Sequence, residues 1–129
     1  MANGADALWV TNHGARQLDT VLTTLEMLPE VAAVGKKHGI PVVFDGGIMR
    51  GSHVFKAIAL GADVVMLGRA VLWSLSAEGA AGVEAMLHIL NRELKECMIA
   101  AGCKNIDDIK QKGTKLLYQP AELLIAPRL

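Results

Sequence analysis

The chain has 129 residues, a length that suits one domain or a piece of a larger one, and its 13 lysine and arginine residues balance 13 aspartate and glutamate residues, so no basic surplus indicates a nucleic-acid partner. Hydrophobic residues make up 52%, but no apolar run approaches the roughly 18 residues that span a bilayer, and no signal sequence is recognisable, so we expect no membrane partner. Cys97 and Cys103 lack the paired spacing of a zinc site and suit a reducing compartment, so we expect idle or buried thiols and no metal.

Three short aliphatic runs, at residues 7–10, 41–44 and 63–67, are predicted to be strands. Each run is apolar on both faces, which is typical of strands in a covered parallel sheet. Each is followed by a polar or glycine-rich turn and then by a helical pattern, which is the alternation of βαβ units. We therefore predict an α/β fold. Three strands cannot close a barrel, so either further strands complete the sheet or the chain is a fragment.

Helical patterns follow the first and second predicted strands. The pattern over residues 20–38 is interrupted by Pro29, which predicts a short turn and then a helix that begins near this proline. Ser52 has the right chemistry for an N-cap and precedes the second helical pattern, over residues 53–60.

The longest predicted helix follows the third strand and runs from about residue 78 to residue 101. A short helix over residues 106–110 is expected next, with Asn105 as its cap. Beyond it the periodicity is weak and two prolines occur. We therefore expect residues 1–112 to form the folded part and residues 113–129 to form a loosely ordered tail.

Polar clusters follow the predicted strands at their carboxyl ends, which is where parallel α/β folds bind ligands. They occupy residues 11–16, 45–51 and 68–69. In the second and third clusters, glycines ahead of helix starts expose N–H groups, and arginine adds a charged fork, a combination that binds phosphate. Alternatively, the glycines only make tight turns and the arginines are surface charges. Two such loops together favour the phosphate site.

The first cluster combines a histidine with an arginine three residues later. Histidine can take a proton near neutral pH, which makes His13 a candidate base, and Arg16 can bind a carboxylate in a bidentate fork. A base beside such a fork is what proton abstraction next to a carboxylate requires. The alternative is a structural histidine bonded to a backbone carbonyl. His38, His53 and His88 receive that structural interpretation.

These residues resemble the C-terminal part of the FMN-dependent α-hydroxy-acid oxidases and dehydrogenases, a family that includes glycolate oxidase, lactate oxidase, flavocytochrome b2 and mandelate dehydrogenase. The similarity runs from about residue 4 to residue 110, and the family's order and spacing are kept by NHGARQLD, PVVFDGGIMRG, VFKAIALGADVVMLGRA and EGAAGVEAMLHILNREL. The resemblance implies a (β/α)8 TIM barrel with FMN at its C-terminal mouth, of which this chain carries strands six to eight and the helices after them.

The resemblance also implies roles for individual residues. His13 matches the catalytic base, and with Arg16 it contacts the substrate. The residues matched to FMN contacts are Thr11, Asp45, Gly46, Gly47, Met49, Arg50, Gly68 and Arg69. Met49 stands where the family usually has a basic residue that contacts the FMN phosphate, and Arg50 is its candidate replacement. The implied reaction is oxidation of an (S)-2-hydroxy acid of the glycolate or lactate type to a 2-oxo acid.

The family's first five strands have no counterpart here, and with them go a flavin-contacting lysine, two tyrosines and an aspartate of the active site. We therefore expect the isolated chain to be inactive. The implied partners are a small 2-hydroxy acid, the missing N-terminal part of the barrel and, for the complete protein, further copies of itself in a homo-oligomer.

Two alternatives stay open. A non-catalytic half-barrel fragment could assemble through its open sheet edges. Another FMN barrel, such as a type 2 isopentenyl-diphosphate isomerase or a nucleotide dehydrogenase, is disfavoured by the Asn-His-Gly-Ala-Arg-Gln run. The last residues, 127–129, are Pro-Arg-Leu and loosely resemble the peroxisomal Ser-Lys-Leu address, so the expected location is cytoplasmic or peroxisomal.

Overall fold

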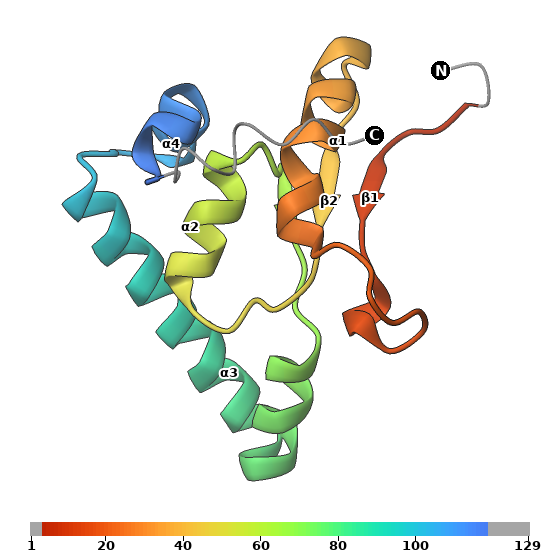
Figure 1. Ribbon diagram of the computed structural model, residues 1–129. Helices are drawn as coiled ribbons and strands as arrows, with labels where there is room; N and C mark the ends of the chain where they lie inside the picture. Colours follow the sequence, from red (N-terminus) through yellow and green to blue (C-terminus); the bar gives the residue numbers. More distant parts are fainter. Residues whose placement is uncertain (1–3, 119–129) are drawn as a thin grey trace.

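The computed structural model describes residues 4–118, in which a parallel sheet is flanked by helices (Figure 1). The sheet has three strands, β1 (Leu8–Val10), β2 (Val42–Phe44) and β3 (Val64–Val65), in the order β1-β2-β3. Both strand pairs are parallel. The predicted strands and the α/β class are therefore confirmed, although each strand is shorter than its apolar run.

The α-helices of the described residues are α1 (Thr24–His38), α2 (Gly51–Ala59), α3 (Arg69–Ala100) and α4 (Ile106–Lys112). Two 3-10 helices, His13–Ala15 and Gly113–Leu116, follow β1 and α4. In the part of the chain that the structure describes, no helix combines the length and the apolar character needed to cross a membrane.

One face of the sheet carries the hydrophobic core. The strand register places Val10 and Phe44 on this face, and they are 6% and 0% exposed. They pack with Leu28 of α1 and Ala57 of α2, both fully buried. Helices α1 and α2 therefore cover the same side of the sheet.

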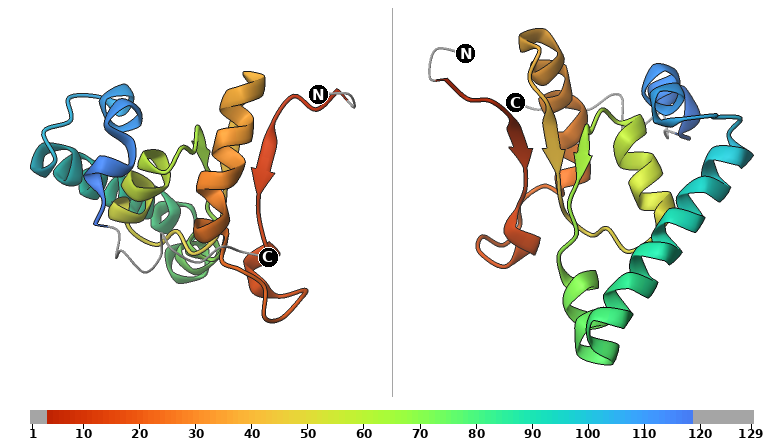
Figure 2. Two further views of the ribbon diagram at one scale, coloured as in Figure 1. Left: turned by 45° about the horizontal axis from the view of Figure 1, so that its top comes forward. Right: turned by 180° about the vertical axis from the view of Figure 1, so that it is seen from behind.

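The opposite face of the sheet is open. Trp9, Val43 and Val64 are register partners on that face, and Trp9 and Val64 are 58% and 48% exposed. Seen from behind, the three strands lie side by side in front of α1, with no helix before them (Figure 2, right). Parallel sheets are normally covered on both faces, so the described residues leave apolar surface that a longer fold would bury.

Helix α1 begins five residues before Pro29, so the predicted break at this proline is wrong. A capping box starts the helix: the Thr23 side chain accepts the Glu26 N–H at 3.3 Å, and the Glu26 carboxylate accepts the Thr23 N–H at 2.8 Å. Leu28, one residue before the proline, is fully buried. The cap and this burial outweigh the backbone hydrogen bond that a proline removes.

Helix α2 begins at Gly51 with Arg50 as its N-cap, so the prediction of Ser52 as the cap is wrong. Arg50 makes no capping hydrogen bond with its own side chain. The acceptor comes from α3, where the Glu93 carboxylate accepts the Gly51 N–H at 2.7 Å. A contact between residues 42 positions apart replaces the local cap that the sequence suggested.

Helix α3 extends further toward the N-terminus than predicted, and it is broken at Glu78 and Gly79. Gly79 has φ 61°, and a Cβ at Gly82 would lie 2.3 Å from the Ser74 carbonyl oxygen. The two glycines therefore let the two halves of α3 turn and pack closely against each other.

Helix α4 is two residues longer than predicted, and its cap is the predicted one, since the Asn105 side chain accepts the Asp108 N–H at 2.8 Å. After it, Leu116 and Leu117 pack against a second core cluster that includes Ile109. The first residues of the expected tail are thus attached to the core, while residues 119–129 lie outside the described part.

Candidate functional site

The three predicted polar loops meet at the carboxyl ends of the strands. The Thr11 hydroxyl donates to Asp45 Oδ1 at 2.9 Å, which joins the loops after β1 and β2. Arg69 Nη2 donates to the Gly14 carbonyl at 3.5 Å, a long bond that brings the loop after β3 to the loop after β1. The structure therefore brings the three loops together at the carboxyl ends of the strands through Thr11, Asp45 and Arg69, whereas Arg50 contacts α3.

The turn that carries the histidine has an unusual backbone. His13, Gly14 and Ala15 have φ values of 53°, 67° and 59°, all in the left-handed region. Such a conformation costs a residue with a Cβ about 1–2 kcal/mol. Two side chains hold the turn: Thr11 Oγ1 accepts the His13 N–H at 3.2 Å, and Asn12 Oδ1 accepts the Ala15 N–H at 3.3 Å. Strain of this kind gathers at functional sites.

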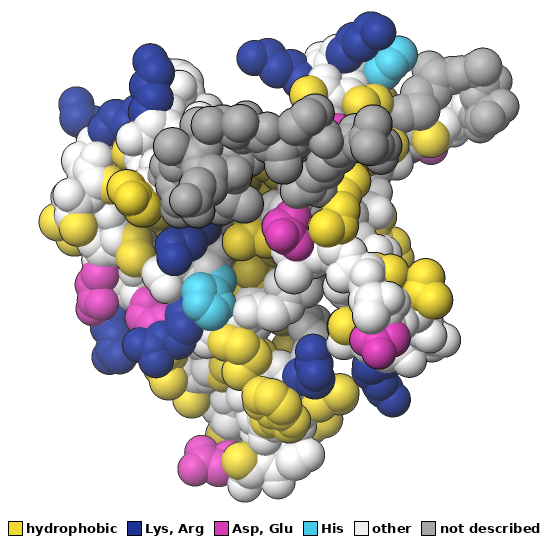
Figure 3. All heavy atoms as spheres, viewed as in Figure 1, with side chains coloured by type: hydrophobic (Ala, Val, Ile, Leu, Met, Phe, Trp, Pro, Cys, Tyr) yellow, Lys and Arg dark blue, Asp and Glu magenta, His cyan; other side chains and the backbone are white. Residues whose placement is uncertain are grey.

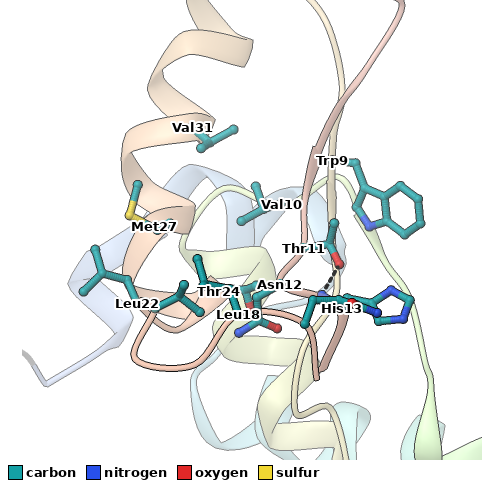
Figure 4. Close-up of a pocket in the computed structure, with 12 residues that line it drawn as sticks. Trp9, Val10, Thr11, Asn12, His13, Leu18, Leu22, Thr24, Met27 and Val31 are labelled. Carbon is teal, nitrogen blue, oxygen red and sulfur yellow. Dashed lines mark hydrogen bonds between the residues drawn. The ribbon is translucent and has the colours of Figure 1, made fainter. Parts of the chain in front are cut away.

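Figure 4 shows how the side chains around this turn lie. The rings of Trp9 and His13 point to the same side, away from Met27 and Val31 of α1. His13 is exposed, and Arg16 closes the turn with an exposed side chain. Among the described residues Arg16 has no hydrogen-bond or ion-pair partner, so its guanidinium can bind a carboxylate.

A cleft of about 620 Å³ lies between this turn and α1, and Trp9, Thr11 and His13 form part of its wall. Its walls are mainly apolar and include Leu18, Val21 and Leu22, which are 69%, 40% and 46% exposed. The cleft lies along the free edge of β1, and no Asp, Glu, Lys or Arg of the described residues lines it, whereas Thr11, Asn12 and His13 do. We therefore assign its apolar part to packing against further chain and place the chemistry at its polar end, where His13 lies.

In the loop after β2, two glycines have positive φ for different reasons. At Gly46, with φ 122°, a Cβ would lie 2.1 Å from the Thr24 hydroxyl oxygen, so the loop must approach the start of α1 closely. At Gly47, with φ 69°, a Cβ would meet no atom within 4 Å. His53 Nδ1 lies 3.1 Å from the Gly47 carbonyl oxygen and 3.3 Å from the Met49 nitrogen, which suits the structural role predicted for this histidine.

The end of this loop contacts Glu93 of α3, a residue that the sequence analysis missed. Arg50 Nε lies 3.1 Å from Glu93 Oε1, and the same carboxylate accepts the Gly51 N–H. The Glu93 side chain is only 17% exposed. Glu93 lies in the quoted segment EGAAGVEAMLHILNREL, but no local pattern links it to a loop 42 residues away.

The loop after β3 leaves a helix start open. Gly68 is the N-cap of α3 and makes no side-chain capping bond, and a Cβ there would meet no atom within 4 Å. Arg69, the first residue of α3, is exposed. Unpaired N–H groups at a helix start attract anions, and the arginine adds a positive charge. This loop fits a phosphate group better than the loop after β2, whose helix start is already capped by Glu93.

The described residues contain no group of three histidine, cysteine, aspartate or glutamate side chains that could hold a metal ion. The site instead offers a histidine, two exposed arginines and open glycine loops. Such donors suit anionic ligands, because arginines and helix-start N–H groups bind phosphate and carboxylate groups.

A family model described as FMN-dependent dehydrogenase matches residues 1–116. An L-lactate oxidase from Lactobacillus jensenii is 45% identical over 121 residues, which are 94% of this chain and 29% of that protein. A 2-hydroxyacid oxidase from Dictyostelium discoideum is 47% identical over 106 residues, which are 82% of this chain and 27% of that protein. The chain thus spans less than a third of the length of these relatives.

Solved structures share the fold. The structure of a refolded lactate oxidase from Pediococcus acidilactici matches with a TM-score of 0.80 at 44% identity, over 84% of this chain and 30% of that chain. A mandelate oxidase with a monooxide FMN adduct matches with a TM-score of 0.79 at 42% identity, over 84% of this chain and 34% of that chain. These neighbours are TIM-barrel oxidases. The chain therefore belongs to the FMN-dependent dehydrogenase family, whose cofactor is FMN, and it matches the C-terminal part of that family.

Proposed function

We propose that this chain is the C-terminal part of an FMN-dependent enzyme that oxidises (S)-2-hydroxy acids of the lactate or glycolate type to 2-oxo acids. The observation that carries the proposal is the meeting of three loops at the carboxyl ends of the strands, through the Thr11–Asp45 and Arg69–Gly14 hydrogen bonds. The relatives named L-lactate oxidase and 2-hydroxyacid oxidase support the substrate class. In this proposal β1, β2 and β3 are the sixth, seventh and eighth strands of the barrel.

The residues present fit FMN at its polar end. The uncapped start of α3 and the Arg69 guanidinium hold the phosphate, because both place positive potential at one point. The loop that begins with Asp45, Gly46 and Gly47 would hold the ribityl chain and the phosphate, and Thr11 would contact the flavin. When bound, FMN accepts the two electrons that the substrate loses.

The chain's own side chains orient the substrate and move its proton. Arg16 binds the substrate carboxylate in a bidentate fork, which fixes the carbon that bears the hydroxyl group. His13 takes a proton from the substrate, and the strained turn places its ring on the open side of the sheet, beside Trp9 (Figure 4). The aspartate that stabilises the protonated histidine in this family belongs to the part with no counterpart here.

The rest of the barrel is the partner that this surface fits. In Figure 3, apolar side chains gather over the lower part of the molecule, where α3 begins and turns (Figure 1). Leu72 and Trp73 in that part of α3 are 59% and 58% exposed. Trp9 and Val64 on the open sheet face add to this apolar surface. We expect the isolated chain to be inactive, because no closed pocket excludes water from the flavin.

A second candidate function is a non-catalytic half-barrel that assembles with a copy of itself through the edges of β1 and β3. The exposed apolar side chains at both edges favour it. The colour and the oligomeric state of the purified chain separate the two functions. A yellow protein has bound flavin, whereas a colourless dimer indicates the non-catalytic half-barrel.

The oligomeric state and the location are also proposals. The complete enzyme is a homo-oligomer that resides in the cytoplasm or in peroxisomes. The tripeptide that suggests peroxisomes, residues 127–129, lies outside the described residues. A fluorescent reporter carrying the last ten residues of the chain tests the peroxisomal location. Import of the reporter into peroxisomes supports it, and a diffuse signal supports the cytoplasm instead.

A chimaera tests the proposed reaction. The part of the Lactobacillus jensenii L-lactate oxidase that precedes the matched region is fused to this chain, and the purified protein is loaded with FMN. We expect L-lactate to bleach the flavin without oxygen. His13→Gln should retain the yellow colour and slow bleaching by about 10²–10⁴-fold, the usual contribution of a general base. His88→Gln, on the exposed face of α3, is the control. Equal bleaching rates in all three proteins would refute the role of His13.

A further inference from the structure

Glu93 connects the long helix α3 to the loop after β2. One carboxylate oxygen accepts the Gly51 N–H at 2.7 Å, and the other lies 3.1 Å from Arg50 Nε. The side chain is 17% exposed, whereas Arg50 is 67% exposed. A half-buried carboxylate with two donors is well fixed, because charge-assisted hydrogen bonds are short and directional.

The backbone around this contact leaves little room. A Cβ at Gly51 would lie 2.3 Å from the Leu94 nitrogen and 2.5 Å from the Leu90 carbonyl oxygen. The start of α2 is therefore pressed against the α3 backbone beside Glu93. Because Arg50 makes no side-chain cap of its own, Glu93 is the acidic group at this helix start, where a negative charge is favourable.

The contact changes which donors remain for the cofactor. The Gly51 N–H is engaged by Glu93 and is not a free phosphate donor, whereas Arg50 gives only its Nε to Glu93 and keeps its Nη1 and Nη2 donors on a side chain that is 67% exposed. Met49 is uncharged, and Arg69 makes only the 3.5 Å bond to Gly14. The loop after β2 therefore contributes a fixed shape, and Arg50 and Arg69 contribute the charge.

We propose that Glu93 is a positioning residue, which holds the loop of residues 45–50 in the shape that receives the FMN phosphate. This inference rests on the proposed function.

FMN and riboflavin, which differ by the phosphate, provide the first test in the chimaera described above. Glu93→Ala should weaken FMN binding by about tenfold or more, the loss expected for a hydrogen bond to a charged group, and should leave riboflavin binding unchanged. Glu93→Gln, which keeps an acceptor for the Gly51 N–H, should recover part of the FMN affinity. Glu96→Gln is the control, because Glu96 pairs with Arg92 at 3.7 Å on the exposed side of α3. An equal loss for FMN and riboflavin overturns the inference.

Hydrogen exchange of the 129-residue chain provides the second test, without flavin. In Glu93→Ala the amides of residues 46–51 should exchange about tenfold faster, and in Glu96→Gln they should not change. Unchanged exchange in Glu93→Ala overturns the inference. A chimaera that binds no FMN overturns the proposed function, and the exchange measurement still decides whether Glu93 holds the loop.

Discussion

At the scale of the residue, the turn that carries His13 contains a strained alanine. Ala15 has φ 59°, in the region that glycine adopts without a Cβ penalty. Ala15→Gly should therefore stabilise the chain by about 1 kcal/mol, which urea denaturation measures. Ala33→Gly, at an exposed position inside α1, should instead destabilise it by about 0.5–1 kcal/mol. Destabilisation by both changes would show that the turn is not strained.

Met49 provides a second prediction at this scale. It is 41% exposed in the loop after β2, and the family usually has a basic residue there. Because Met49 carries no charge, Met49→Arg should add a phosphate donor and strengthen FMN binding by the chimaera about tenfold, without a change for riboflavin. Ile99→Arg, at a position 78% exposed near the far end of α3, adds the same charge as a control. Equal gains in both variants would indicate a general charge effect.

At the scale of the element, Asp63 ties β3 to its neighbours. Its carboxylate accepts the Val42 N–H at 2.9 Å and the Lys110 ammonium at 2.7 Å. Burial alone raises the pKa of Asp63, but the Lys110 hydrogen bond, the Val42 N–H and the charge of Lys110 outweigh it and hold the pKa below its ordinary value of 3.8. Folding therefore favours the charged form of the Asp63 carboxyl group.

This pKa shift predicts how stability depends on pH. A carboxylate with a lowered folded-state pKa contributes fully above its unfolded value and loses its contribution as the pH falls through the folded value. Asp63→Ala should cost about 1 kcal/mol at pH 7, a figure reduced for solvent screening at a side chain 39% exposed. The difference from the unaltered chain should shrink below pH 3.8. Asp6→Ala is the control, because Asp6 ends the same Gly-Ala-Asp sequence before β1 as Asp63 does before β3 but is exposed, so that its loss should cost little at pH 7.

The elements also show what the sequence could predict. The strands and the glycine loops were predicted because apolar runs and turn residues are local signals. The start of α1 was predictable as well, since Thr23 and Glu26 form a capping-box pattern, but Pro29 drew the prediction away from it. The start of α2 was not predictable, because its acceptor comes from Glu93 on another helix.

At the scale of the whole molecule, the described residues form one sector of a larger fold. The core lies between the sheet and α1 and α2, while the opposite sheet face and both sheet edges expose apolar side chains. The sequence predicted that the loops of His13, Asp45 and Arg69 meet at one end of the sheet, because parallel strands place their carboxyl ends together. It could not predict the left-handed turn at His13 and Ala15, since alanine rarely adopts that conformation and histidine, although enriched there, adopts it in a minority of cases.

The most direct test of this account is reconstitution from two pieces. The 129-residue chain is titrated into the separately produced preceding part of the Lactobacillus jensenii enzyme with FMN, and L-lactate oxidation is followed. The account predicts no turnover by either piece alone and turnover that rises and saturates with the amount of chain added. Turnover by the 129-residue chain with FMN alone, at the rate of the mixture, would contradict it.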